Sequence, residues 1–151
     1  MHTSTHHECD TEALNSLLRG ELSATETYTQ ALSKFEDQQV IANLQRIREE
    51  HNRAVQTWRD RVVHFGGTPS EGSGAWGTFA SAVTGTAKVI GPGIVLAALK
   101  QGEEHGIGQY ESALENPDLH PDCQQLIRTE LLPACRKHVV ELDRLIGGMD
   151  N

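Results

Sequence analysis

Four ionisable residues interrupt stripes of apolar residues in this sequence. Each lies near the middle of a segment whose apolar residues recur every three or four positions, the spacing of one face of a helix. The four are Glu21, His51, Glu103 and His138. An unpaired charge in a protein core is costly, so carboxylates and imidazoles placed there need a partner. A divalent metal ion is one sufficient partner, and these oxygen and nitrogen donors suit iron, manganese or zinc. We therefore predict that Glu21, His51, Glu103 and His138 are metal ligands.

The elements that position these residues are four predicted helices. Their apolar stripes cover residues 14–35, 40–65, 96–113 and 127–145. Signals that end helices follow the last three stripes, namely Gly66-Gly67, Asn116-Pro117 and Gly147-Gly148. Consecutive helices with short turns pack side by side, so the sequence predicts an all-α fold, an antiparallel four-helix bundle made of two helical hairpins.

The fourth predicted helix contains a proline. Pro133 lies within the apolar stripe, where it removes a backbone donor and clashes with the carbonyl group four residues earlier. We therefore expect a kink near Thr129.

A long crossover connects the two predicted hairpins. Residues 66–93 are rich in Gly, Ser, Thr and Pro, and within them Trp76 and Phe79 begin an apolar run at helical spacing. We interpret this run as a short helix across the bundle, with Trp76 and Phe79 buried; a lid or a dimer contact is the alternative. Residues 1–10 are a polar N-terminal tail, and residues 11–147 are predicted to form a single bundle domain.

The two halves of the chain repeat each other. The pattern Gly-Glu-x6-Tyr-x2-Ala-Leu occurs once in each half, with Glu21 and Tyr28 in the first and Glu103 and Tyr110 in the second. In each predicted hairpin the glutamate and the histidine lie equally far from the turn. Antiparallel helices of equal rise should then place all four ionisable residues in one layer.

These motifs resemble those of the ferritin-like superfamily. From about Thr11 to Gly147 the chain is most similar to a bacterial ferritin-like family of unknown function. The resemblance rests on the two Gly-Glu-x6-Tyr motifs, the turn Gly66-Gly67-Thr68-Pro69, the glycine-rich crossover and Leu131-Leu132-Pro133 before His138. It implies a ferritin-like bundle with a metal site in its core, and a role in iron handling or oxidation chemistry. The superfamily pattern is a Glu from each of two helices and a Glu-x-x-His from each of the others.

The chain departs from that pattern three residues before each histidine, where Arg48 and Cys135 replace the glutamates that would bridge two ions. We therefore expect one metal ion and not an iron pair. Glu50 and Glu104 are flanking candidates, because a neighbour along a helix is turned by roughly 100° from the seam.

A metal-free core is the alternative interpretation. Arg48 could pair with Glu21 or Glu103, since an arginine–carboxylate cluster also satisfies buried charge. The protein would then be a helical bundle acting as an interaction or stress protein. Whether the protein is an enzyme stays open at this point.

The composition limits the classes of partner that the protein is expected to bind. With 21 Asp and Glu against 13 Lys and Arg, the chain is not expected to bind nucleic acid or an anionic membrane. No apolar run approaches the roughly 20 residues of a membrane span. The cysteines are odd in number and widely spaced (Cys9, Cys123 and Cys135), which favours free thiols. We expect a cytoplasmic protein and, from the ferritin-like resemblance, a homodimer.

Overall fold

The computed structural model describes residues 10–72 and 91–149 of the chain. These residues form α2 (Thr11–Leu32), α3 (Gln38–His64), α5 (Pro92–Leu114) and a last helix in three parts, α6 (Pro121–Leu126), the π-helical turn η1 (Ile127–Leu131) and α7 (Leu132–Met149). The described part of the chain contains no strand. The predicted all-helical class is therefore confirmed for residues 10–72 and 91–149. None of the helices described has the length and apolar character needed to cross a membrane.

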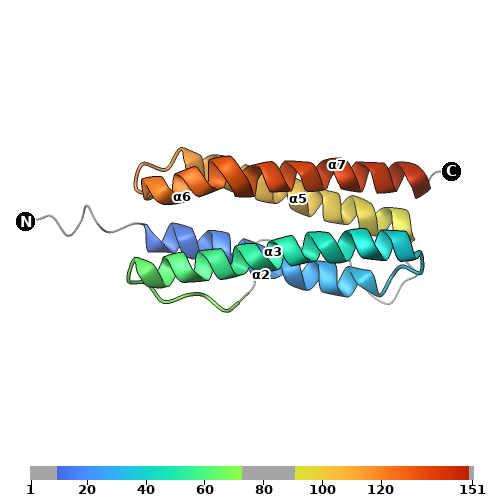
Figure 1. The fold of residues 1–151 in the computed structure, drawn as a ribbon, viewed down its shortest axis with the longest axis horizontal. Coiled ribbons are helices and arrows are strands. Elements are labelled where there is room, and N and C mark those ends of the chain that lie inside the picture. The colour runs from blue at the N-terminus through green and yellow to red at the C-terminus, as the bar shows by residue number, and fades with distance from the viewer. Residues whose placement is uncertain (1–9, 73–90, 150–151) are drawn as a thin grey trace, which may run out of the picture.

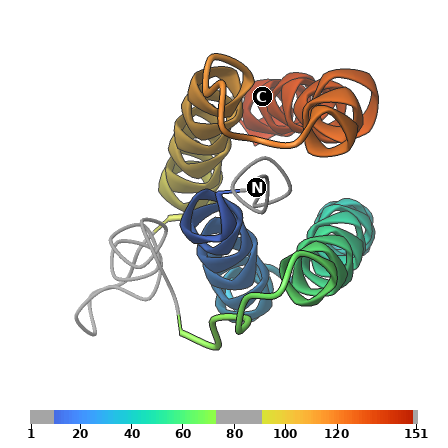
Figure 2. The ribbon, with the colours of Figure 1, turned by 90° about the vertical axis from the view of Figure 1, so that its left-hand side faces the viewer.

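The helices lie in two pairs. Figure 1 shows α2 beside α3 and α5 beside α7, with the colour gradient running in opposite directions along the two helices of each pair. The two pairs approach each other most closely where α2 meets α5, whereas α3 and α7 lie further apart. The end view of Figure 2 shows the same arrangement.

The helix ends follow from local side-chain chemistry. The carboxylate of Asp10 accepts a hydrogen bond from the Ala13 amide at 2.9 Å and caps α2, and Asp37 caps α3 in the same way. Such caps satisfy amide groups that have no partner within the helix. After α3 the chain turns at Gly66, whose φ of 88° suits a residue without a side chain. The predicted stop at this glycine is found.

The crossover begins as predicted but ends earlier, because α5 already starts at Pro92. Trp76 and Phe79, for which we predicted burial, lie outside the described residues. The predicted end of the last helix at Gly147-Gly148 is wrong, because α7 continues to Met149. A glycine ends a helix readily when it adopts left-handed backbone, and among the described glycines only Gly66 does so.

The last helix is irregular near Thr129, where we expected a kink because of Pro133. The irregularity is the π-helical turn η1, in which the Leu132 amide donates to the carbonyl of Ile127, five residues earlier. This extra residue per turn shifts the inward face of the helix. Leu132 and Cys135 are buried, whereas Leu131 and Ala134, the members of the predicted stripe, are partly exposed. The predicted stripe was therefore wrong by one residue at Leu131 and Ala134, since it assumed unbroken α-helical spacing, whereas its members Ile127, His138 and Leu142 are buried as predicted.

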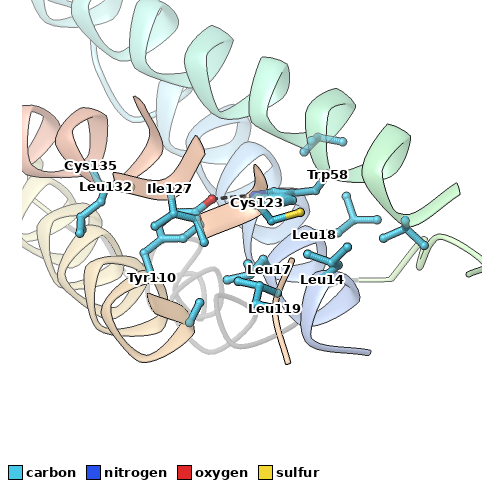
Figure 3. Close-up of a cluster of buried hydrophobic side chains, with 13 residues drawn as sticks. Leu14, Leu17, Leu18, Trp58, Tyr110, Leu119, Cys123, Ile127, Leu132 and Cys135 are labelled. Carbon is cyan, nitrogen blue, oxygen red and sulfur yellow. Dashed lines mark hydrogen bonds between the residues drawn. The ribbon is translucent and has the colours of Figure 1, made fainter. Parts of the chain in front are cut away.

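The apolar core consists of two clusters on either side of a polar layer. The first contains Leu14, Trp58 and Ile127 among others, and Figure 3 shows how its side chains converge. The second contains Leu44 and Leu96 among others. On each long helix the predicted ionisable residue falls between the residues of the two clusters. The buried polar layer is thus enclosed by apolar packing at both ends.

Candidate metal centre

The structure brings the four predicted ionisable residues into the interior. Glu21, His51, Glu103 and His138 lie on α2, α3, α5 and α7 respectively and are 5%, 3%, 0% and 2% exposed. Such residues are almost never buried this deeply unless they are paired. Their contacts with one another therefore decide what the layer can do.

His51 joins the two carboxylates of the layer. Its Nδ1 lies 2.5 Å from Oε1 of Glu21, and its Nε2 lies 2.7 Å from Oε2 of Glu103. The imidazole therefore links α3 to both α2 and α5 through its two ring nitrogens.

His138 also contacts two carboxylates. Its Nδ1 lies 3.2 Å from Oε1 of Glu103, and its Nε2 lies 2.7 Å from Oε1 of Glu50. Of the two flanking candidates, Glu50 therefore reaches the layer from the side. The expectation for Glu104 was wrong, because this residue is exposed on α5 and lines a surface hollow elsewhere. Its helical position, one residue after the inward-facing Glu103, turns its side chain away from the layer.

The carboxylates favour the charged form of both imidazoles. Burial lowers the pKa of His51, but the charges of Glu103 and Glu21 outweigh burial and hold that pKa well above its usual range. The same balance, with Glu103 as the main partner, raises the pKa of His138. Burial raises the pKa of Glu103, but the charges of His51 and His138 outweigh it and hold that pKa far below its usual range. The layer therefore favours charged imidazoles beside a charged Glu103.

The two tyrosines of the repeated motif cross between the halves of the chain. Tyr28, on α2, donates its hydroxyl hydrogen to Glu103 at 2.6 Å, and Tyr110, on α5, donates to Glu21 at 2.5 Å. Trp58 in turn donates to the Tyr110 hydroxyl at 2.9 Å, the contact drawn in Figure 3. Burial, followed by the charge of the carboxylate it faces, raises the pKa of each tyrosine. Both hydroxyls therefore stay protonated and fix the orientation of the two carboxylates.

Cys135 is buried beside the layer. Burial, reinforced by the charges of Glu103 and Glu21, raises the pKa of its thiol well above the usual range. A small void of about 10 Å³ lies between Cys135, Glu21 and His51, which is about the volume needed for one water molecule. The neutral thiol is favoured in this environment, where it also lies within hydrogen-bonding reach of Glu103.

Arg48 does not pair with the core carboxylates, so this part of the metal-free alternative is wrong. Its guanidinium lies 3.5 Å from the hydroxyl of Thr29 at the surface. His51 and His138, and not Arg48, supply the positive charge opposite Glu21 and Glu103. The outward direction of Arg48 follows from its long side chain, which can reach water from the edge of a helix seam.

Replacing Arg48 by alanine should therefore change the free energy of unfolding by no more than about 0.5 kcal/mol, because the arginine neutralises no buried charge. Urea denaturation of the two proteins at one pH measures this difference. A loss of several kcal/mol would show that Arg48 supports the core after all.

Three of the four residues could hold a single metal ion. His51, Glu103 and His138 each offer one ligand atom, and these atoms all lie within 4.8 Å of one another. Glu21 is not part of this group and instead contacts the opposite nitrogen of His51. The sequence pattern identified the residues of the layer, but it did not separate Glu21 from the other three or assign a contact to Glu50.

Comparison with known proteins provides a family but no activity. A family model described as a domain of unknown function, DUF2383, matches residues 10–116, which span α2, α3 and α5 and include Glu21, His51 and Glu103. No curated protein and no solved structure matches the chain. Because the match covers well over half of its length, the chain belongs to the DUF2383 family.

Proposed function

We propose that this protein is a metal-binding member of the ferritin-like superfamily, an antiparallel four-helix bundle whose core holds one divalent ion of iron, manganese or zinc. The observation that carries the proposal is the group His51, Glu103 and His138, with its three ligand atoms within 4.8 Å of one another in a buried layer. Iron handling or oxidation chemistry is the role that the ferritin-like resemblance suggests for such an ion.

The geometry of the three residues fits a metal ion. The ligand atoms around one tetrahedral zinc ion lie roughly 3.4 Å apart, given metal–ligand distances near 2.1 Å. Atoms that already lie within 4.8 Å of one another can reach that spacing by small side-chain rotations. Two imidazoles and one carboxylate also form a donor set used by zinc and by non-haem iron.

Glu21 supports this group from behind. A histidine that binds a metal generally donates its other ring N–H to a carboxylate, which fixes the tautomer and the ring orientation. Glu21 occupies that place beside Nδ1 of His51, so Nε2 is the nitrogen directed toward Glu103 and His138. Tyr110 holds Glu21, and Tyr28 holds Glu103. These contacts position the ligands and do not bind the ion.

The same residues support one ion in preference to two. The positions three residues before the histidines carry Arg48, which points to the surface, and Cys135, whose buried thiol is neutral. Neither supplies a carboxylate that could bridge a second ion. Glu50 contacts the outer nitrogen of His138 and lies on the opposite side of that ring from Glu103.

Equilibrium binding tests the proposal. Metal-free protein titrated with Zn²⁺ or Co²⁺, and with Fe²⁺ or Mn²⁺ without oxygen, should bind one ion per chain. His51→Gln should weaken binding about a hundredfold or more, because losses of this size already follow from disturbing residues behind a metal ligand. His64→Gln, an exposed histidine on the same helix, serves as the matched control and should bind as the wild type does. Elemental analysis of the purified protein that finds no metal, together with a flat titration, would refute the metal site.

A metal-free bundle is the second candidate, and one observation favours it. Both ring nitrogens of His51 and of His138 already contact carboxylates, so the charges of the layer can be satisfied internally. The protein would then act as an interaction or stress protein with a polar core. The titration just described separates the two candidates. Only a metal site should bind one ion per chain with an affinity that falls when His51 is replaced.

A further inference from the structure

The buried layer is closed on the sides formed by its tyrosines. Tyr28 and Tyr110 are 0% and 2% exposed, and Trp58 behind Tyr110 is 0% exposed. Large side chains in close-packed surroundings leave no space for a hydrated ion to pass. A residue that contacts the layer and is partly exposed is therefore the better candidate for an entrance.

Such a residue lies between α3 and α7. These two helices lie further apart than α2 and α5, as the end view in Figure 2 shows. Glu50, on α3, is 25% exposed and yet lies 2.7 Å from Nε2 of the buried His138. It contrasts with the other carboxylates that contact the layer, because the side chains of Glu21 and Glu103 are 6% and 0% exposed. The side chain of Glu50 is therefore partly exposed to solvent and also in contact with the buried His138.

An arginine lies at the outer end of this connection. Arg46, whose side chain is 42% exposed, lies 3.5 Å from Oε2 of Glu50 and forms a closer ion pair with Glu141 of α7. Exposed ion pairs contribute little free energy and exchange readily with water. Glu50 is therefore a partly exposed carboxylate that an incoming cation can bind.

We propose that Glu50 and Arg46 form the entrance through which a divalent cation reaches the core, with Glu50 as the first ligand and Arg46 as a positive charge that must move aside. This inference rests on the proposed metal site. Glu50 can carry the ion because one of its oxygen atoms faces the solvent side while the other faces His138. Arg46 slows entry because its guanidinium holds the place beside Glu50 that the cation must occupy, and Glu141 holds Arg46 there.

Rates of metal uptake test the entrance separately from the site itself. Metal-free protein is mixed with Co²⁺ in a stopped-flow instrument, and the absorbance of the bound ion is followed at low and at high salt. Glu50→Gln should slow association about tenfold, because charged residues at a cleft change association rates by roughly this factor or more, while one ion per chain is still bound at equilibrium. Arg46→Gln should accelerate association at least about threefold, and this gain should shrink at high salt.

Two neighbours on the same helix provide matched controls. Glu49→Gln removes an exposed carboxylate that lies next to Glu50, and Arg48→Gln removes an arginine that contacts only Thr29 among the described hydrogen-bond partners. Each control removes a charge of the same sign as Glu50→Gln or Arg46→Gln does, and so changes the net charge equally. If the rates depend on the contacts of Glu50 and Arg46 and not on net charge, both controls should leave the association rate within about twofold of the wild type.

The possible results distinguish the entrance from the metal site. Unchanged rates in both Glu50→Gln and Arg46→Gln, with one ion still bound per chain, would overturn the entrance and leave the metal site standing. Loss of equilibrium binding in Glu50→Gln without any acceleration in Arg46→Gln would make Glu50 a permanent ligand and would also overturn the entrance. A wild-type protein that binds no Co²⁺, Zn²⁺ or Fe²⁺ at equilibrium would remove the proposed function and the entrance together.

Discussion

Replacing Glu103 by glutamine should lower the free energy of unfolding of the metal-free protein by about 3–5 kcal/mol. Glu103 is fully buried and accepts contacts from Tyr28, His51 and His138. Without its charge, two buried imidazoles must either remain charged without their common partner or give up protons that they hold in the native protein. The loss should be largest at about pH 5.5, where a histidine in an unfolded chain is mostly protonated.

Glu104→Gln is the control for this prediction, because Glu104 is the adjacent residue, carries the same charge and is exposed. Its substitution should change the free energy of unfolding by no more than about 0.5 kcal/mol. Chemical denaturation of both variants, monitored by circular dichroism, measures the difference between them. Equal stability of Glu103→Gln and Glu104→Gln would mean that the ion-paired layer does not stabilise the fold.

The affinity for a divalent cation should rise steeply with pH. The pKa values of His51 and His138 are raised in the metal-free protein, and each imidazole must release a proton before it can bind a metal ion. Below those pKa values two protons compete with one ion, so the binding constant should increase by up to about a hundredfold per pH unit. Because the shifts are upward from about 6.5, this dependence should continue through neutral pH.

The same shifts determine how the metal-free protein responds to pH. A group whose pKa is raised by folding stabilises the protein fully below its unfolded pKa, and this contribution disappears as the pH rises through the folded pKa. The metal-free protein should therefore lose stability on the alkaline side, where the metal-bound form is favoured. Competition with a chromogenic chelator from about pH 6 to 8 measures the dependence. His64→Gln should keep the wild-type slope, and a flat profile for the wild type would exclude proton-linked binding by the two histidines.

The sequence was sufficient to identify the helices and the residues of the polar layer. Apolar periodicity places four long helices, and one ionisable residue interrupts each stripe. The matched distances from the turns also identify residues that the structure brings into contact: His51 with Glu21 and Glu103, and His138 with Glu103. These features are local or follow from helix geometry, which is why the sequence reveals them. The role of the four residues as metal ligands stays a prediction.

Other features depend on tertiary contacts that no periodic pattern records. Helical periodicity alone would not place Glu50 in contact with the core, because that contact is made with His138 on another helix, α7. The burial of Leu132 and Cys135 depends on the π-helical turn; Pro133 signals an irregularity there but not its form. The direction of Arg48, whose guanidinium lies near Thr29 at the surface, is likewise absent from the apolar pattern.

The crossed tyrosine contacts make the two halves of the chain interdependent. Each hairpin carries a buried glutamate, but the hydroxyl that orients this glutamate comes from the other hairpin, Tyr110 for Glu21 and Tyr28 for Glu103. Neither half therefore contains a complete set of groups, and an isolated hairpin would expose a charged face and a carboxylate without its donor. Duplicated sequences with such reciprocal contacts can only diverge together, since a change to one tyrosine affects the glutamate of the other half. In this protein the covalent link between the halves ensures that each glutamate always meets its donor.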